Sequence, residues 1–425
     1  MRLLIILFTT VFLANTAQAF CGFYVAKADG SLYNQSSKIV FVRDGKNSVI
    51  TMSSDYRGAP SDFAMIVPTP KVLRQEQVRT VDAKVIAHLD SYTAPRLVEY
   101  FDDDPGAPAI LELPIIVEEA SPRRGAKKQA PIRSRARAQG VTIKAQYAVG
   151  QYDILILKAK QSDGLATFLK GEGYKLPQGA EFVLADYIDS GMKFFVAKVN
   201  LSRHAAGKSR ELPPLQIAFR SNSFMLPIQL GKLNADKAQD ALFFMLSRKG
   251  RVEVANYKSK ILPSDTNVPV FVEKVFPQFY RDMFRKTVGR AGGIVMEYAW
   301  DMSWCDPCAA DPLSNAELRQ LGVRWARGEG TPQNVYVTRL HAQYSKGQMQ
   351  KDLVFRTTKN RQNFQGRYVM NHPYDGKLTC AAGKDYVRET KKRLGQEAKQ
   401  LSKITGWSVS SINKNIRKTT ARAYR

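Results

Sequence analysis

The chain has 425 residues and a formal net charge of +26, from 64 Lys or Arg residues against 38 Asp or Glu. Hydrophobic residues make up 44% of it, which is typical of a folded protein and excludes a wholly disordered chain. The length suffices for two or three domains. Beyond the first twenty residues, no run of eighteen is apolar and uncharged, so the sequence predicts no membrane-spanning helix in the mature chain.

The first nineteen residues have the order of a secretory signal peptide. Arg2 is basic, Leu3 to Leu13 form an apolar stretch, and Ala17-Gln18-Ala19 is a small-x-small cleavage site. The apolar stretch is too short for a stable membrane anchor. We therefore predict cleavage before Phe20 and export to the periplasm or the extracellular space.

Two segments carry most of the net charge. Residues 121–140 hold seven basic and no acidic residues, and residues 384–425 hold twelve basic and three acidic ones, giving +7 and +9. Such charge points to an anionic partner. For an exported protein this is a membrane surface or an acidic envelope polymer, and nucleic acid is disfavoured. The predicted contacts are Arg123, Arg124, Lys127, Lys128, Lys414, Arg417 and Lys418.

The first hundred residues predict strands and then helices. β-Branched and aromatic runs predict strands at 23–26, 38–42, 48–52 and 63–67. Asp44-Gly45 predicts a hairpin between the second and third, and the nearly continuous apolar residues predict burial on both faces. Asp82 is a candidate N-cap for a helix, and Pro95 predicts a second helical segment that reaches Phe101. The acidic run Asp102–Asp104 follows, as a solvated turn or a cation site.

Pro, Ala and basic residues dominate the next stretch, which predicts a disordered basic insertion at 118–140. This divides the chain into residues 20–117 as the N-terminal part of the body, 141–383 as the main body and 384–425 as a basic helical tail. Strands are predicted at 141–149, 152–159, 193–200, 215–220, 241–247, 251–257 and 292–300, with a strand meander at 334–344, 352–358 and 363–370. Helices are predicted at 163–173, at 315–321 and at 270–288 with a kink at Pro277.

The C-terminal segment predicts two amphipathic helices. Val387, Leu394 and Leu401 lie on one stripe, and Gly406 is a candidate C-terminal cap. Val409, Ile412 and Ile416 predict a second short helix with basic residues on its other face. This tail either docks on the body or lies on an anionic membrane surface. The predicted fold class is α+β, a mixed fold rich in antiparallel strands with a few packed helices and this C-terminal amphipathic helix.

Four cysteines allow three disulfide pairings in an oxidising compartment: Cys21, Cys305, Cys308 and Cys380 are the candidates. Trp304-Cys305-Asp306-Pro307-Cys308 resembles the redox motif of thioredoxin-like proteins, in which the first cysteine begins a helix. Asp306 and Pro312 weaken that interpretation and favour a structural cysteine loop. A zinc site from Cys305, Cys308 and Cys380 with His341 or His372 has no compact spacing.

No hydrolase, metalloprotease or nucleotide-binding motif is present, and no cofactor is predicted. The histidines are scattered, at His88, His204, His341 and His372, and His88 and His341 are predicted to be structural. The main functional hypothesis is a non-enzymatic envelope protein that binds an anionic partner. The alternatives are a thiol–disulfide oxidoreductase that uses Cys305 and Cys308, and a hydrolase without a recognisable motif.

Several unusual strings resemble a bacterial family of exported proteins, the domain of unknown function 2330. They include CGFYVAKAD, SDFAMIVPTP, SYTAPRLVEYFDDDP, EYAWDMSWCDPC and NRQNFQGRYVMNHP. The resemblance covers residues 21–105 and roughly 145–410, and it implies export but no activity. Family members often carry a cysteine just after the acidic run, where this chain has Gly106, so no disulfide scheme is transferred.

Overall fold

The computed structural model describes residues 23–27, 36–54, 63–106, 141–159, 162–200, 212–234, 238–306, 310–378 and 380–420. The predicted signal peptide, the insertion at 118–140, Cys21 and Cys308 lie outside the described residues. The signal peptide and the basic insertion therefore stay predictions.

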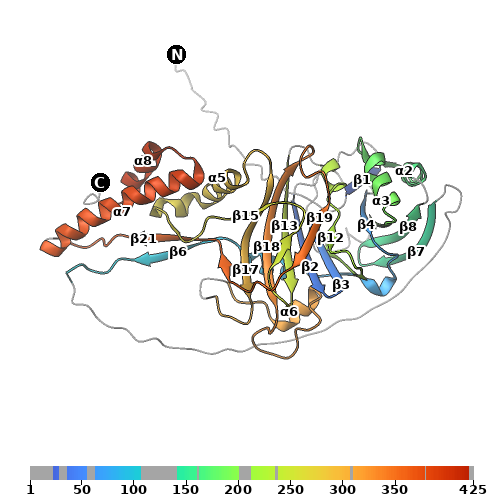
Figure 1. Ribbon diagram of the computed structural model, residues 1–425, viewed down its shortest axis with the longest axis horizontal. Coiled ribbons are helices and arrows are strands. Elements are labelled where there is room, and N and C mark those ends of the chain that lie inside the picture. Colours follow the sequence, from blue (N-terminus) through green and yellow to red (C-terminus); the bar gives the residue numbers. More distant parts are fainter. Residues whose placement is uncertain are drawn as a thin grey trace, which may run out of the picture.

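An antiparallel sheet of six strands forms one half of the body (Figure 1). Its order is β7 (Val141–Val149), β8 (Tyr152–Ala159), β10 (Lys193–Val199), β4 (Phe63–Thr69), β1 (Phe23–Lys27) and β9 (Tyr174–Lys175). Strands that precede and follow residues 107–140 thus pair within one sheet.

A larger, mixed sheet of nine strands forms the other half. Its order is β15 (Ser259–Ile261), β17 (Gly293–Asp301), β18 (Tyr336–Ser345), β13 (Ala238–Ser247), β2 (Ser36–Asp44), β3 (Asn47–Ser54), β11 (Leu215–Arg220) and β5 (Val78–Thr80), and β20 (Phe364–Gln365) pairs with β17. The predicted hairpin is β2 and β3, and Gly45 takes a φ of +57° in its turn, a conformation that favours glycine. Strand β13 runs parallel to β2, so the sheet joins distant segments.

The two large sheets share one core, to which alternate residues of their strands contribute. Ile39 and Phe41 of β2 point into it, whereas Val40 and Val42 belong to the cluster on the sheet's other face. All four are at most 2% exposed. A strand with apolar layers on both sides needs apolar residues at every position, which explains the continuous run in the sequence.

Helices cover the outer face of each sheet. Helices α2 (Ser162–Gly171) and α3 (Ala180–Asp189) pack on the six-stranded sheet. Helices α1 (Ala83–Thr93) and α6 (Asn315–Gln320) pack on the nine-stranded sheet. The body is therefore a four-layer sandwich of helices, sheet, sheet and helices. A small antiparallel sheet of β12 (Met225–Leu226), β19 (Leu353–Thr357) and β14 (Val252–Val254) adds to the central core.

A separate hydrophobic cluster lies at one end of the elongated molecule (Figure 1). A parallel sheet of β16 (Thr266–Asn267), β21 (Arg367–His372) and β6 (Arg96–Phe101) lies there. The helical elements are η3 (Val270–Val275), α5 (Phe276–Val288), α7 (Ala381–Thr405) and α8 (Val409–Thr419), and two further 3-10 turns lie elsewhere, η1 (Gln75–Gln77) and η2 (Gly231–Asn234).

The α+β class, the hairpin and both C-terminal helices are confirmed. Three local predictions are wrong. Residues 96–101 form strand β6 rather than a helix, because they pair in parallel with β21. The three late strands form no meander, because none of them pairs with another: β18 pairs with β13 and β17, β19 with β12 and β14, and the third divides into β20, beside β17, and β21, beside β6. Pro277 does not kink a long helix but lies in the first turn of α5, where its missing N–H costs nothing.

Candidate functional site

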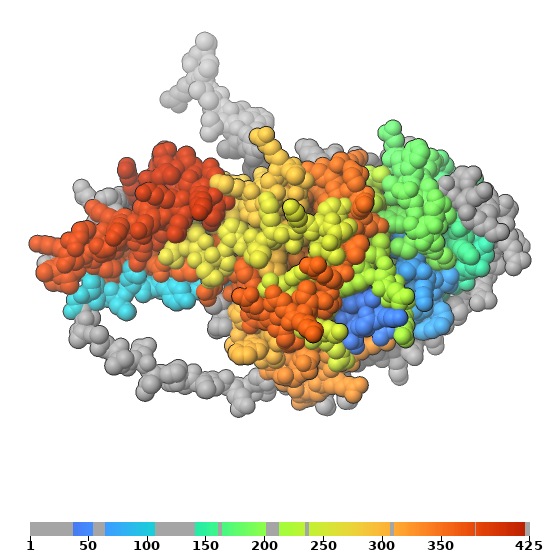
Figure 2. Space-filling model, in the orientation of Figure 1, coloured from blue at the N-terminus to red at the C-terminus, as the bar shows by residue number. Residues whose placement is uncertain are grey.

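The C-terminal helices α7 and α8 dock on the body through their apolar stripes. Leu394, Ala398 and Leu401 of α7 are at most 4% exposed, and Ile412 and Ile416 of α8 are at most 6% exposed. They pack in one cluster with η3, α5 and β21. Figure 2 shows both helices on the surface at one end of the molecule, with β6 beside them. The apolar side chains of α7 and α8, which could otherwise have entered a membrane, are therefore buried against the protein body.

The outward faces of these two helices are strongly basic. Helix α8 contains no acidic residue, and the predicted contacts Lys414, Arg417 and Lys418 are all exposed. Together with Ser410 and Asn413 they line a shallow hollow. The outer cations that form no ion pair with the described residues are Lys384, Lys391, Lys399, Lys403, Lys414, Arg417 and Lys418. We call these seven residues the basic face.

The acidic run after β6 holds α7 in place. The Asp102 carboxylate accepts hydrogen bonds from Arg393, at 2.6 and 3.1 Å, and from the Tyr386 hydroxyl. Burial alone would raise the pKa of Asp102, but these bonds lower it below its usual value. Asp104 accepts a hydrogen bond from Tyr374 at 3.0 Å. Asp102 and Asp104 thus contact the C-terminal segment, while Asp103 and Asp104 are exposed, so the predicted solvated turn is confirmed for part of the run only.

A buried carboxyl group of α7 itself, that of Glu397, has an oxygen, Oε1, without a hydrogen bond to the described residues. Glu397 is 2% exposed, and its nearest cation, Arg393, is 3.8 Å away and bonded to Asp102. Burial raises the pKa of Glu397 to about 7, against the opposing effect of Arg393. The docking of α7 therefore includes a group that titrates near neutral pH.

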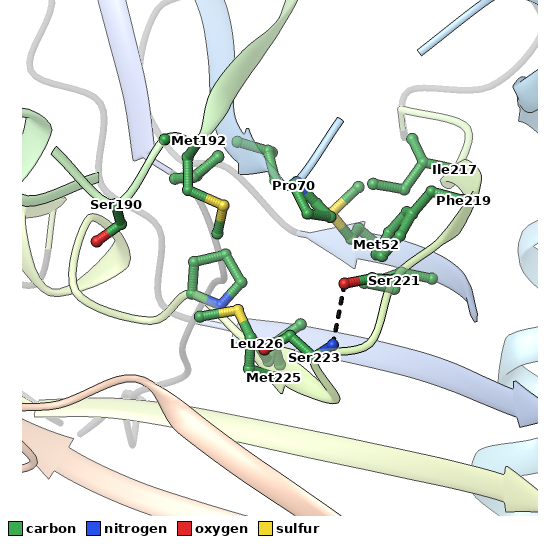
Figure 3. A pocket seen from close by; sticks show the side chains of 15 residues that line it. Met52, Pro70, Ser190, Met192, Ile217, Phe219, Ser221, Ser223, Met225 and Leu226 are labelled. Atoms are coloured by element: carbon green, nitrogen blue, oxygen red, sulfur yellow. Dashed lines mark hydrogen bonds between the residues drawn. The ribbon is translucent and has the colours of Figure 1, made fainter. Parts of the chain in front are cut away.

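An apolar pocket of about 260 Å³ lies between the two large sheets (Figure 3). Its floor is made of side chains from β3, β4, β11 and β12, all less than 10% exposed: Ile50, Met52, Val67, Ile217, Phe219 and Leu226. Met192 and Met225 are partly exposed and extend into it from opposite sides. Ser190, Ser221 and Ser223 lie at its rim, and no described lining residue is charged.

A buried ionic network lies on the face of the nine-stranded sheet that points away from the pocket. Arg339 of β18 donates to Glu297 of β17 at 2.7 Å and to Asp90 of α1 at 2.5 Å. His341 contacts Glu297 through Nδ1 and Asp240 through Nε2, both at 2.8 Å. Further contacts come from Tyr280, which hydrogen-bonds to Glu297 and lies 2.8 Å from His341, and from Lys38, which pairs with Asp90.

The network fixes the charge of its members. Burial would raise the pKa of Glu297, but His341 and Arg339 lower it to about 2. Burial would lower the pKa of His341, but Glu297 and Asp240 raise it to about 9. Glu297 is fully buried, Arg339 is 5% exposed and His341 8% exposed. With these groups so deeply buried, the arrangement links α1 and α5 to the four strands β2, β13, β17 and β18.

The described part of the cysteine motif, Trp304 to Asp306, does not begin a helix. Cys305 lies after the end of β17, and the next described helix, α6, begins only at Asn315. Within the described residues, the helix start that a thioredoxin-like motif requires at Cys305 is therefore absent, and Cys308 itself is not described. Cys305 and Cys380 are both exposed free thiols. Cys380 lies at the N-cap of α7, where its sulfur accepts a hydrogen bond from the Gly383 N–H at 3.3 Å. Because Cys21 and Cys308 are not described, the disulfide pairings stay predictions.

The histidines contact separate structural partners. His88 of α1 lies 2.8 Å from Glu317, and His372 stacks on Phe101 and contacts Glu99 at 3.0 Å. His204 is outside the described residues. Within the described part of the chain, no group of three His, Cys, Asp or Glu side chains could hold a metal ion. The described members of the zinc set, Cys305, Cys380, His341 and His372, thus form no such group, and Cys308 is not described.

Sequence reasoning found the basic face but missed the pocket and the network. Arg123, Arg124, Lys127 and Lys128 lie outside the described ranges, so their role stays a prediction. The network had a usable signal, since Arg339 and His341 are two residues apart in an apolar strand and so share one face. The pocket had no such signal in the sequence, because its lining comes from distant segments that only the pairing of the strands brings together.

Comparisons with known proteins give a family but no activity. No curated protein and no solved structure matches the chain. Within the described residues, no helix combines the length and the apolar character that crossing a membrane requires. A family model described as an uncharacterized protein conserved in bacteria matches residues 15–356. It leaves out β20, β21, α7 and α8. Because the match spans most of the sequence, the chain belongs to the DUF2330 family, the bacterial proteins with the domain of unknown function 2330.

Proposed function

We propose that the protein is an exported, non-enzymatic envelope protein that binds an anionic membrane surface through the basic face of α7 and α8. The carrying observation is the sorting of side chains on these helices. Their apolar side chains are buried against the body, while seven outer cations face solvent without an ion pair to the described residues. A docked helix with a cationic outer face binds by electrostatics, so it adsorbs to a surface without inserting.

The basic insertion at 118–140 adds to this proposal. Its seven cations would contact the same kind of surface, as the sequence predicts. Each cation held near an anionic lipid surface contributes on the order of 1 kcal/mol. Binding should therefore weaken steeply with salt, because exposed charges are screened over about 10 Å at 0.1 M salt.

Vesicle co-sedimentation with charge-neutralising variants tests the proposal. The tail must stay in place, because its removal would open the cluster that Leu394 and Leu401 fill. The test variant therefore replaces three α8 cations by glutamine: Lys414→Gln, Arg417→Gln and Lys418→Gln. The control removes three exposed cations of the body: Lys249→Gln, Lys258→Gln and Lys359→Gln.

Both variants lose the same formal charge, so any difference between them reports position. We expect the α8 variant to bind phosphatidylglycerol vesicles at least about tenfold more weakly than the control, since three contacts are lost. Phosphatidylcholine vesicles should bind neither. Equal binding by the two variants would refute a specific role of α8.

A second candidate, thiol–disulfide exchange, has one favourable observation, namely that Cys305 is free and exposed beside the 67% exposed Trp304. Exposure is needed for attack on a disulfide. Mass spectrometry after alkylation under mild reductant would detect a reversible Cys305–Cys308 bridge, and a pair that does not cycle excludes this activity.

A further inference from the structure

The pocket between the sheets is independent of the basic face. It is lined by β3, β4, β11 and β12 in the sandwich, whereas α7 and α8 lie at the end of the molecule (Figure 1). A ligand in this pocket would thus be bound separately from any surface that α8 contacts. The inference does not rest on the proposed function.

The lining determines which chemistry fits. Its described residues carry no charge, so an ionised group would lose its hydration there without gaining a partner. The buried floor is aliphatic or thioether, apart from Phe219. A flat aromatic ligand could therefore stack on only one ring among the described lining residues, that of Phe219. Three methionines, Met52, Met192 and Met225, adapt their shape easily and suit a flexible aliphatic chain.

The size of the pocket sets the length of the chain. A dry cavity of about 150 Å³ binds benzene. The present pocket holds about 260 Å³. If a methylene group takes about the 30 Å³ of a water molecule, roughly eight to ten carbons fill it. The polar end of such a molecule would lie at the exposed rim, where Ser190 and Ser223 border solvent.

We propose that this pocket binds the unbranched hydrocarbon chain of a medium-length amphiphile, with the chain on the buried floor and the polar end at the serine rim. The partner chemistry is a saturated acyl or alkyl chain. Because the described lining carries no charge, the hydrocarbon chain supplies the affinity, and a carboxylate and an alcohol of equal chain length should bind alike.

Displacement of a fluorescent probe tests this with the full mature chain. The protein is titrated with N-decyl dansylamide, whose fluorophore lies at the polar end of a ten-carbon chain, and the probe is displaced with decanoate, decan-1-ol or butanoate. We expect one saturable probe site, displacement by both ten-carbon compounds and none by butanoate. Wild-type protein without a saturable site, or displacement by butanoate at equal concentration, would overturn the proposal.

Two variants locate the site. Ser223→Trp places a large ring at the rim, and Asn222→Trp adds the same ring at an exposed neighbour that is not part of the lining. We expect Ser223→Trp to weaken decanoate binding at least tenfold and Asn222→Trp to leave it unchanged. Met192→Asp, which puts a charge at the chain, should have the same effect as Ser223→Trp. Near-UV circular dichroism checks that each variant folds. Equal affinity in all folded variants would place the probe elsewhere and overturn the proposal.

Discussion

Glu297→Gln tests whether the buried network stabilises the fold. The substitution keeps the shape of the side chain and removes the carboxylate that Arg339 and His341 contact at 2.7 and 2.8 Å. Lowering the pKa of Glu297 from its usual 4.5 to about 2 corresponds to roughly 3 kcal/mol at 1.36 kcal/mol per unit. Loss of one partner from a buried pair costs about the same, 3–5 kcal/mol. We therefore expect the free energy of unfolding to fall by about 3 kcal/mol.

The pH dependence makes the test sharper. The Glu297 contribution is present above pH 4.5 and is lost as the pH falls towards about 2, because its folded-state pKa is lowered. The His341 contribution is present below pH 6.5 and is lost as the pH rises through about 9, because its pKa is raised. In Glu297→Gln, His341 retains only the Asp240 carboxylate. The variant should therefore lose less stability than the wild type between about pH 6.5 and about pH 9.

Urea unfolding followed by circular dichroism at about pH 5.5 and about pH 9 measures both effects. The matched control is Glu253→Gln, which breaks the exposed pair with Arg356 and should cost less than about 1 kcal/mol. The reasoning is refuted if Glu297→Gln and Glu253→Gln destabilise equally, or if the alkaline loss of stability is the same in Glu297→Gln as in the wild type.

Two further substitutions probe the docking of α7. Glu397→Gln should raise the free energy of unfolding by about 2–3 kcal/mol at pH 8 and by little at pH 4.5. The reason is that a carboxyl group with its pKa raised to about 7 destabilises the fold as the pH rises. Urea unfolding at the two pH values measures this difference. Gly106→Cys should form a disulfide with Cys380, because a Cβ at position 106 would lie 3.6 Å from the Cys380 sulfur. Closing so long a loop stabilises by up to about 5 kcal/mol. Thiol titration and thermal unfolding with and without reductant would detect the bridge, and Gly106→Cys with Cys380→Ser should show neither effect.

The sequence predicted those elements whose cause is local. The run Ile39–Val42 has apolar residues at every position because two layers cover its strand. The spacing of Leu394 and Leu401 and the αL conformation of Gly406 at the end of α7 are equally local signals. Residues 96–101 were mistaken for a helix because their structure depends on pairing with residues 367–372, which no nearby residue reveals. The pocket escaped prediction for the same reason.

The boundary of the family match bears on how the basic face arose. The match ends at residue 356, yet α7 and α8 share one cluster with Phe279 and Met283 of α5, which lie inside the match. Asp102, also inside the match, binds Arg393 of α7. The matched body thus contributes one half of an apolar and ionic interface, and the segment beyond the match contributes the other half. Because the apolar stripes of α7 and α8 are buried in that interface, the remaining outer face tolerates any polar residue, and this chain places on it seven cations that form no ion pair with the described residues. Its charge is therefore the least constrained by folding and the most informative about a partner.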